Sequence, residues 1–423
     1  MRTRVLAAAG AAVALGITMA GCGSSSSGGG GGGGGSSQSA ASGAPINLGV
    51  VTSLTGGYAS GFTTVENGVK ARLAVENAKG GIGGHKLTYT MTDDASTPQG
   101  ALAAVNKLAK QEKVFGILDA SPVFYGGAAA AKAAQMPVSG VSFDGGSAWT
   151  DPSYTTFFDA YGQADFSLVA TTWGEFFKSQ GCTKVGAIGN TGPSSGRAAS
   201  AAVASAVHAG LAKGYLDSKL SPGTTDVGPS VIGIKSTGTD CLYVPVTPSL
   251  AFALTAGLKQ AGVTTKAVVL ATGYGGDILA SKPSVEAAQG IDFTSAGAPV
   301  EADTAATKAF QAALKQYAGV TGVPTFGEYV GWTVADLFIH GLQLAGGDAS
   351  QADFVKALRG SSDWDAGGLY PHAVDYSDPA PLEGGLSPGN CLNVVKLTGE
   401  QFVPIAGANP VCGEIIKGVT VSQ

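Results

Sequence analysis

Residues 46–91 read INLGVVTSLTGGYASGFTTVENGVKARLAVENAKGGIGGHKLTYTM, and this stretch decides the fold. Ile46–Val51 is a short, largely apolar run, which is typical of a buried strand. After a turn-rich loop, Thr63 with Glu66 three residues later predicts a helix that begins with a capping box. The helix ends at a glycine pair, and residues 87–91 alternate between apolar and polar side chains, as a half-exposed strand does. The stretch therefore predicts a strand, a helix and a second strand.

Strands and helices continue to alternate along the rest of the chain. Helices are expected, for example, over residues 164–179 and 326–345. Such alternation is typical of doubly wound α/β layers with parallel strands, in which ligands bind at the carboxyl ends of the strands. We expect the chain to cross between two lobes near residues 157–163, 291–296 and 383. Further strands are expected at Val114–Leu118, Pro137–Val141, Lys184–Ile188, Leu242–Val246 and Ala267–Leu270.

Four features near the start of the folded chain carry a family resemblance. They are Leu54-Thr55-Gly56 in the first loop, Glu76-Asn77 at the helix end, Gly80-Gly81-Ile82 in the next turn, and Asp93-Asp94 followed by Pro98. In this order and spacing the chain resembles the leucine/isoleucine/valine-binding family, the type I periplasmic binding proteins of ABC importers, and the resemblance extends to about Leu397. It implies two doubly wound parallel-sheet α/β lobes, 45–160 plus 297–383 and 161–296 plus 384–423. A three-strand hinge is expected to join them, so that the lobes close on a ligand.

The composition narrows the possible functions. Of the 423 residues only 13% are charged, the formal net charge is −5, and the sequence has no basic cluster. Proteins that bind nucleic acid carry a basic patch, so a nucleic-acid partner is not expected. The chain is long enough for two domains, each with its own core.

The first 44 residues are expected to form an export signal and a tether. Residues 1–21 have a basic start and an apolar run that is too short to span a membrane, for which about 20 residues are needed. Ala20-Gly21 before Cys22 is similar to the bacterial lipobox, so Cys22 is expected to carry a lipid, as in a lipoprotein of the actinobacterial type. An ordinary secretion signal with an incidental cysteine is the alternative. Residues 22–44 form a Gly/Ser-rich tether, which would hold an extracytoplasmic domain at the cell membrane.

Export also favours disulfides, because extracytoplasmic compartments are oxidising. Cys182 and Cys241 each precede an expected strand, and neighbouring parallel strands would place them side by side. Cys391 and Cys412 bracket an expected hairpin. Of the three possible connectivities we favour these two pairs. A metal site is not expected, because no CxxC spacing occurs and the four histidines are scattered, and no cofactor is expected either.

Polar residues at strand ends of the first lobe are candidates for ligand contacts. Ser121 follows one expected strand, and Ser142 and Asp144 follow the next. The resemblance implies that Ser121 holds a ligand carboxylate and that Ser142 contributes a backbone contact. Asp144 stands where the family often has threonine, so it supplies an anion for a ligand ammonium or excludes a second carboxylate. The alternatives are a helix cap for Ser121 and an exposed turn for Asp144.

The first loop and the second lobe supply the other candidates. Tyr58 caps the apolar end of a ligand or packs at the lobe edge, and Asn190 and Thr247 follow strands of the second lobe. Amino-acid binders of the family usually place a glutamate in the loop that here reads ATGYGGD, residues 271–277, and this loop has Tyr274 but no glutamate. This difference favours an aromatic, amide or other small amphipathic ligand over a branched-chain amino acid.

Two other functions remain open. Gly192-Pro193-Ser194-Ser195-Gly196 matches G-x-S-x-G between a strand and a helix, the setting of a hydrolase nucleophile, here Ser194. Two residues separate the strand from the motif and no oxyanion segment precedes it, so we expect Ser194 to be inert. Similar domains also serve as ligand sensors without transport, which requires a separate output partner.

We therefore expect a lipid-anchored, monomeric solute-binding protein of an ABC importer that performs no catalysis. Its partners are a small-molecule ligand, the permease subunits and, through the lipid, the membrane. The ligand is a branched-chain amino acid or another small amphipathic molecule, such as an amide or an aromatic acid, held in the cleft between the lobes.

Overall fold

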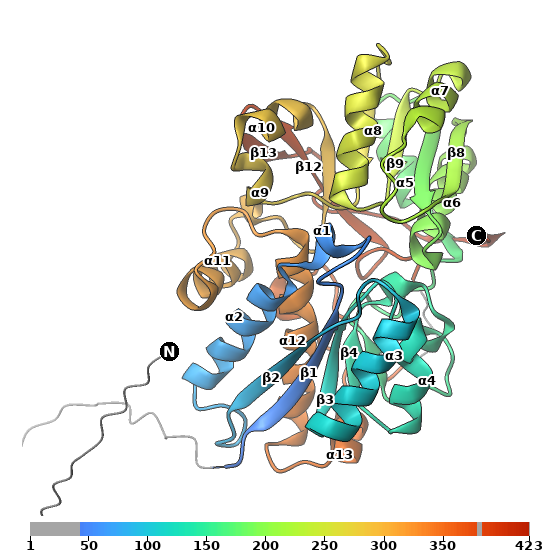
Figure 1. Ribbon diagram of the computed structural model, residues 1–423. Coiled ribbons are helices and arrows are strands. Elements are labelled where there is room, and N and C mark those ends of the chain that lie inside the picture. Colours follow the sequence, from blue (N-terminus) through green and yellow to red (C-terminus); the bar gives the residue numbers. More distant parts are fainter. Residues whose placement is uncertain (1–42, 379–382, 423) are drawn as a thin grey trace, which may run out of the picture. The chain divides into compact units, whose positions relative to one another are not determined.

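The structure, a computed structural model, describes residues 43–378 and 383–422. The first sheet in it is parallel throughout. Five strands lie in the order β2-β1-β3-β4-β5, and Figure 1 labels β1 to β4 in the lower part of the folded chain. Each strand except the edge strands is paired on both sides, which satisfies its backbone groups. The strands are β1 (Ile46–Thr52), β2 (Leu87–Asp93), β3 (Gly116–Ala120), β4 (Val138–Gly140) and β5 (Phe157–Asp159).

Helices cover both faces of this sheet (Figure 1). Leu48 and Val50 of β1 share a core cluster with α2 and α12, whereas Val51 belongs to a second cluster with α3 and α4. Successive strand residues point to opposite faces, so both faces of β1 are buried, as its apolar run predicts. The helices are α1 (Ala59–Phe62), α2 (Val65–Ala78), α3 (Pro98–Lys107), α4 (Tyr125–Ala133), α11 (Ala305–Ala313), α12 (Phe326–Ala345) and α13 (Gln351–Leu358).

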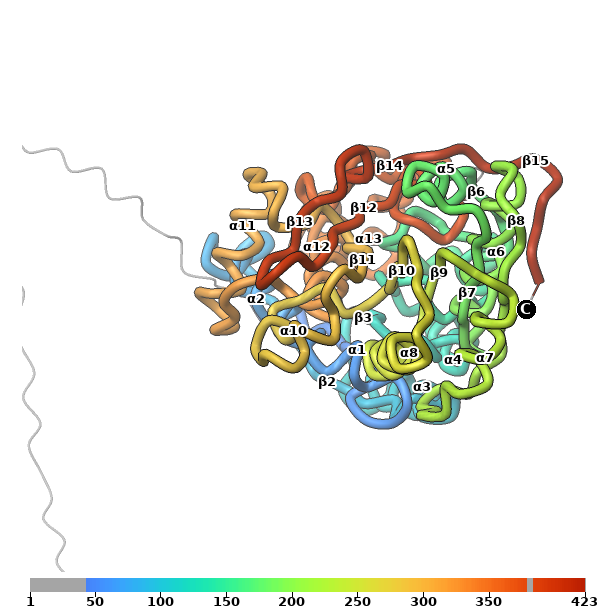
Figure 2. The backbone as a smooth tube through the Cα atoms, turned by 90° about the horizontal axis from the view of Figure 1, so that it is seen from above, coloured from blue at the N-terminus to red at the C-terminus, as the bar shows by residue number. Residues whose placement is uncertain are grey.

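The second sheet combines a parallel part with an antiparallel edge. Its main order is β13-β12-β11-β10-β9-β7-β8, which Figure 2 shows from above. Strands from β11 to β8 are parallel, β12 is antiparallel to both β11 and β13, and β14 also pairs with β12. The strands are β7 (Lys184–Asn190), β8 (Ala212–Leu220), β9 (Cys241–Val244), β10 (Ala267–Leu270), β11 (Asp292–Ser295), β12 (Cys391–Thr398), β13 (Gln401–Pro404) and β14 (Val411–Cys412). The helices of this lobe are α5 (Thr172–Ser179), α6 (Pro193–His208), α7 (Gly228–Thr237), α8 (Pro248–Gln260), α9 (Gly276–Leu279) and α10 (Lys282–Ala288).

The chain passes between the two sheets where the sequence predicts it: after β5, after β11 and before β12. The first and last passages lie side by side, because Ala164 forms a parallel bridge with Glu383 and the Asp165 N–H donates to the Glu383 carbonyl at 2.7 Å. In the middle passage the Ala298 N–H donates to the Leu369 carbonyl at 2.7 Å. The predicted fold, two parallel-sheet α/β lobes with several crossings, is confirmed.

Two predictions about helix starts are wrong. The capping box of Thr63 and Glu66 does not form, because α2 begins at Val65 and the Tyr89 hydroxyl donates to the Glu66 carboxylate. The helix expected from residue 164 begins only at Thr172. The segment before it forms β6 (Leu168–Ala170), which pairs with β15 (Ile415–Thr420) near the C-terminal end. This pairing across more than 240 residues overrides the local helical pattern.

Both predicted disulfides are confirmed. Cys182 bonds to Cys241, and Cys391 bonds to Cys412. The first pair joins the starts of β7 and β9, which are neighbours in the sheet, as the argument from parallel strands requires. The second pair joins β12 to β14, which are directly opposite each other.

Glycine allows α2 and α12 to approach each other closely. A Cβ atom at Gly68 would lie 2.1 Å from the Glu328 carbonyl oxygen, and one at Gly331 would lie 2.1 Å from that of Val65. Both distances are far inside van der Waals contact, so any larger side chain would push the helices apart. The apolar side chains of Val65, Val69 and Leu73 in α2 are buried in the core cluster that α2 shares with α12.

The predicted membrane attachment lies outside the described residues. The signal peptide, Cys22 and the tether up to residue 42 all precede Gly43, whose N–H donates to the Gly84 carbonyl at 3.0 Å. Within residues 43–378 and 383–422, no helix combines the length and the apolar character that a membrane crossing requires.

Candidate functional site

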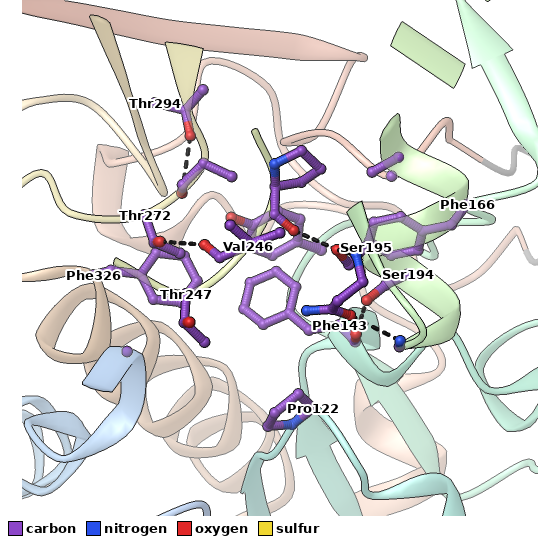
Figure 3. Close-up of a pocket in the computed structure, with 18 of the residues that line it drawn as sticks. Pro122, Phe143, Phe166, Ser194, Ser195, Val246, Thr247, Thr272, Thr294 and Phe326 are labelled. Carbon is purple, nitrogen blue, oxygen red and sulfur yellow. Dashed lines mark hydrogen bonds between the residues drawn. The ribbon is translucent and has the colours of Figure 1, made fainter. Parts of the chain in front are cut away.

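A cavity of about 140 Å³ lies where the two lobes meet (Figure 3). Residues at or just beyond strand ends line it from both sides. Pro122 follows β3, Phe143 follows β4 and Tyr161 follows β5, while Asn190 ends β7 and Ser295 ends β11. The carboxyl ends of both parallel sheets therefore face one site, which is where α/β folds bind ligands.

Aromatic rings make up much of the apolar wall. The ring centroid of Phe143 lies 4.7 Å from that of Tyr161 and 5.4 Å from that of Phe326. In Figure 3, Phe326 and Phe166 lie on opposite sides of the cavity. The aromatic residues of the lining are Tyr58, Phe62, Phe143, Tyr161, Phe166, Tyr243 and Phe326.

Four residues of the second lobe that line the cavity donate their hydroxyl groups to the backbone (Figure 3). The four pairs are Ser194 with the Phe143 carbonyl, Ser195 with Pro245, Thr272 with Val246 at 2.7 Å and Thr294 with Ala271 at 3.1 Å. These oxygens therefore offer a ligand only lone pairs. Asn190 is the opposite case, because its Oδ1 accepts from the Gly192 N–H at 2.8 Å and its amide hydrogens have no acceptor in the described part of the chain.

Three of the predicted ligand-binding residues line the cavity: Tyr58, Asn190 and Thr247. Burial raises the pKa of the Tyr58 hydroxyl to about 12, so this group is a neutral donor at physiological pH. Thr247 is the N-cap residue of α8, with its hydroxyl 3.4 Å from that of Ser249. The structure brings these residues together, and their contact with a ligand stays a prediction.

The two predicted serines of the first lobe lie beneath the lining rather than in it. Ser121 is fully buried, its hydroxyl accepts from the Val123 N–H at 3.1 Å, and its own N–H donates to Asp119. Ser142 is 1% exposed and its N–H donates to the Asp159 carboxylate at 3.2 Å. Both serines hold the turns that follow β3 and β4, which position Pro122 and Phe143.

Asp144 and Tyr274 also lie outside the lining. Asp144 is fully buried, and its Oδ1 accepts from the Gly146 N–H at 2.9 Å and from the Trp149 ring N–H at 2.8 Å. The alternative of an exposed turn aspartate is therefore wrong. Tyr274 is 2% exposed and donates its hydroxyl to the carboxylate of Glu301, a residue of the first lobe.

Most rings of the aromatic wall are not among the residues predicted from the sequence. Phe143 stands between the predicted residues Ser142 and Asp144, and Phe326 is the first residue of α12, directly after the capping residue Thr325. Tyr161 and Tyr243 lie at strands β5 and β9. The signal available in the sequence was the position of these rings, because strand ends and helix starts meet at the site. The candidates were selected for their polar groups, and this criterion does not select aromatic rings.

Asp144 belongs to a group of buried carboxyl groups at the ends of β2 to β5. Burial raises the pKa of Asp94, Asp119, Asp144 and Asp159. For Asp144 it reaches about 6, and the pKa of Asp119 lies well above its usual range because burial and the neighbouring Asp144 both disfavour its charge. These carboxyl groups support the turns beneath the cavity and are neutralised readily as the pH falls.

The stability of the variant Asp144→Asn relative to the wild-type protein is expected to be higher at pH 7 than at pH 4. In the unfolded chain the carboxyl group ionises near the ordinary aspartate pKa of 3.8, whereas burial raises the folded pKa to about 6. The stability that the protonated group contributes below pH 4 is therefore lost as the pH rises to 6. Asparagine stays neutral and its oxygen can accept the same two hydrogen bonds. The advantage of the variant in unfolding free energy should grow by about 2 kcal/mol between pH 4 and pH 7, since one pKa unit corresponds to about 1.4 kcal/mol.

Urea denaturation of both proteins at several pH values measures this difference. The groups that titrate beside Asp144 are Asp119, Asp159 and Tyr125, and they are present in both proteins. A difference that does not change with pH would contradict the assignment. Because Asp144 does not line the cavity, ligand affinity should stay the same in the variant.

The geometry around Ser194 disfavours a hydrolase. Ser194 is the second residue of α6, and its hydroxyl donates to a backbone carbonyl instead of to a base. Among the described residues that line the cavity there is no histidine and no carboxylate. A serine nucleophile needs such a group within hydrogen-bond reach to take its proton.

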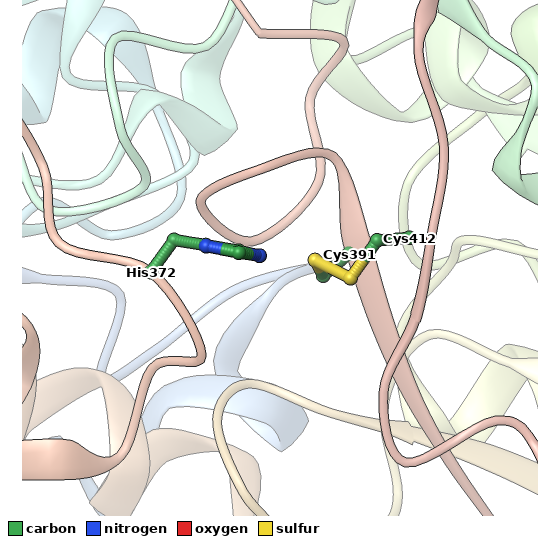
Figure 4. Close-up of side chains that lie close together, drawn as sticks. All are labelled: His372, Cys391 and Cys412. Atoms are coloured by element: carbon green, nitrogen blue, oxygen red, sulfur yellow. A yellow bond between two sulfur atoms is a disulfide. The ribbon is translucent and has the colours of Figure 1, made fainter.

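One cluster of possible metal ligands occurs in the described ranges, formed by His372, Cys391 and Cys412 (Figure 4). Their ligand atoms lie within 4.8 Å of one another. Both sulfur atoms belong to the same disulfide, however, and a metal requires the thiolate. The cluster is a packing contact of the His372 ring with the disulfide.

The fold and the cavity define the class of two-lobed α/β binding proteins that hold a ligand between their lobes. The chain belongs to the periplasmic binding protein family, whose family model matches residues 45–385. This confirms the family resemblance that the loop and turn motifs of the sequence indicate.

Two relatives match over short stretches. Leu/Ile/Val-binding protein homolog 2 of Brucella abortus (strain 2308) is 39% identical over 64 residues, which is 15% of this chain and 17% of the relative. Leu/Ile/Val-binding protein BraC3 of Rhizobium johnstonii is 37% identical over 65 residues, 15% of this chain and 18% of the relative. The matched stretch spans less than a fifth of each curated relative.

Solved structures are similar over nearly the whole chain. A solute-binding protein of an R. palustris ABC transporter, in complex with benzoate, has a TM-score of 0.69 at 16% identity, with 89% of this chain and 98% of that chain covered. A fatty acid ABC transporter substrate-binding protein from Thermomonospora curvata has a TM-score of 0.69 at 18% identity, covering 88% and 92%. A leucine-binding protein from Thermotoga maritima has a TM-score of 0.66 at 15% identity, covering 87% and 99%. These low identities establish the shared fold alone.

Proposed function

We propose that this protein is the extracytoplasmic solute-binding component of an ABC importer, which encloses one small amphipathic molecule between its lobes. The observation that carries the proposal is the cavity, because side chains of both lobes line it and it combines an apolar wall with a few polar groups. Family membership supports the transport role. The similar structures include a complex with benzoate, a substrate-binding protein of a fatty acid transporter and a leucine-binding protein, and each of these molecules combines an apolar part with a carboxylate.

Contacts beside the cavity join the two lobes and support a closing motion. The Ser194 hydroxyl donates to the Phe143 carbonyl, and the Arg197 guanidinium donates to the Gly145 carbonyl at 3.0 Å. These bonds connect α6 to the turn after β4, so they can form only when the lobes are close. A ligand that contacts both lobes would stabilise the same state, which a permease can recognise.

The anchoring and the partners are part of the proposal. Residues 1–21 act as signal peptide, Cys22 as lipid attachment site and residues 22–44 as tether, as the lipobox-like sequence suggests. The moving bodies are 45–160 plus 297–383 and 161–296 plus 384–423. The protein works as a monomer with the permease subunits as partners and performs no catalysis.

Ligand contacts are proposed for Tyr58, Asn190 and Thr247, together with the rings of Phe143 and Phe326. A supporting role outside the lining is proposed for Ser121, Ser142 and Asp144, which are bonded within the first lobe, and for Tyr274, which bonds to Glu301 of the other lobe.

A thermal-shift screen of the purified protein against amino acids, amides, aromatic acids, fatty acids and sugars tests this function. A ligand at about a thousand times its dissociation constant adds roughly 4 kcal/mol to the stability of the folded state. We expect one chemical class to raise the melting temperature by several degrees.

The variant Phe143→Ala should abolish or strongly reduce this shift, because it removes the central ring of the cavity wall. Phe115→Ala is the matched control: Phe115 is a partly buried ring of the same lobe that packs on Phe338 and Phe354 instead. It should lower the melting temperature but preserve the shift. Absence of a shift with every compound, after refolding to remove bound ligand, would contradict the proposed function.

A further inference from the structure

The cavity between the lobes has no charged side chain among the described residues that line it. An α-amino acid brings an ammonium group, which loses its hydration in such a site and needs a carboxylate partner. The buried Asp144 lies behind the lining, and its carboxylate is held by Gly146 and Trp149. The hydroxyls of Ser194 and Thr272 offer lone pairs but no charge. An ammonium therefore finds no countercharge in this cavity.

The donors at the cavity suit an anion instead. Both α6 and α8 begin at the lining, and each has proline at its first position. The N–H groups that follow in the first turn have no partner within the helix, as at the start of any helix. In α6 these N–H groups belong to Ser194 and Ser195, and both residues line the cavity. Helix N-termini carry a partial positive charge and bind carboxylates.

Asn190 is an independent indication of an acceptor on the ligand. Its side chain is 3% exposed and lines the cavity, at the end of β7 and next to the start of α6. Because its oxygen already accepts from the Gly192 N–H, its NH₂ group is directed elsewhere, and no acceptor in the described chain receives it. Since Asn190 lines the cavity, this NH₂ group is available to a ligand, and a ligand oxygen can accept from it.

The cavity as a whole has the dimensions for one ring, and its wall has the chemistry for one. Its volume of about 140 Å³ is close to that of an apolar protein cavity, about 150 Å³, known to take up benzene. The rings of Phe143, Tyr161 and Phe326 meet at tilted or edge-on angles, an arrangement into which a further ring can pack.

We infer that the cavity selects an aromatic monocarboxylate, with its ring against the wall that Phe143, Tyr161 and Phe326 form and its carboxylate at Asn190 and the start of α6. This inference rests on the proposed function and names the ligand class. Ligands with an ammonium group are excluded by the missing countercharge, and sugars by the apolar wall.

Isothermal titration calorimetry with the purified protein tests the inference, with benzoate, 4-hydroxybenzoate and phenylacetate as probes. At least one of them should bind ten times more tightly than its neutral amide, and at least a hundred times more tightly than L-phenylalanine or L-leucine. Asn190→Asp should weaken binding of that carboxylate more than tenfold and change binding of the amide much less, because the new charge repels only the anion. Gln316→Glu adds the same charge at an exposed position and should change neither.

Three other results of these measurements would each contradict a different part of the proposal. Tighter binding of leucine or of a sugar than of all three acids would overturn the ligand class and leave the transport role standing. Equal binding of the acid and its amide would overturn the role of the helix start and Asn190. If no compound of any class binds to the folded protein, the proposed function itself is wrong.

Discussion

Replacing Arg72 with methionine is expected to lower the free energy of unfolding by about 3 to 5 kcal/mol, the usual effect of removing one partner from a buried ion pair. Arg72 is 8% exposed in α2 and holds two carboxylates. Its Nε lies 2.6 Å from Asp336 and its terminal nitrogen 3.2 Å from Glu76. Methionine fills similar space but leaves Asp336 without its cation, and Glu76 with only the exposed Lys79 at 3.7 Å, in the contact between α2 and α12.

The matched control is Lys70→Met, which removes the same charge from an exposed position of the same helix. It should change the unfolding free energy by less than about 0.5 kcal/mol. Adding Glu76→Gln and Asp336→Asn to the Arg72 variant should restore much of the loss, because neutral groups do not need the cation. Urea denaturation followed by circular dichroism measures all variants. An Arg72→Met protein as stable as the Lys70→Met protein would show that the ion pairs contribute nothing.

Much of the fold could be predicted because local patterns and global packing agree. The apolar run of β1, the 20 residues of α12 and the strand β10 have the period and length of the elements they form. The disulfide Cys182–Cys241 followed from two parallel strands that had to be neighbours. The predictions were wrong where a segment distant in the sequence determines the local structure. Residues 168–170 extend as β6 only because β15 pairs with them, and no local pattern shows this partner.

The site could be predicted only in part, for a related reason. Strand ends were the right places to search, and Tyr58, Asn190 and Thr247 line the cavity. Ser121 and Ser142 are also at strand ends, but their side of the turn faces the lobe interior, where burial and the neighbouring aspartates occupy them. A sequence gives the position of a residue along a strand, whereas the direction of its side chain in the following turn depends on that turn. The aromatic wall was missed because rings at these places look like core residues.

Loss of the Cys182–Cys241 disulfide, as in the double variant Cys182→Ala and Cys241→Ala, is expected to lower the free energy of unfolding by about 4 kcal/mol. The bond links residues 59 positions apart, and in the chain-entropy account a loop of this length restricts the unfolded chain by roughly that amount. Both cysteines are buried at the starts of neighbouring strands, so the two alanines also lose packing.

The second disulfide provides the internal control. Cys391 and Cys412 are only 21 positions apart, and Cys412 is exposed, so the corresponding double variant should lose about 1 kcal/mol less through the loop term alone. Both variants keep their cavity lining, and ligand affinity measured below the unfolding transition should stay within about twofold, since neither cystine lines the cavity. An equal or larger loss for the shorter loop would contradict the entropic explanation and place the stabilisation in native packing instead.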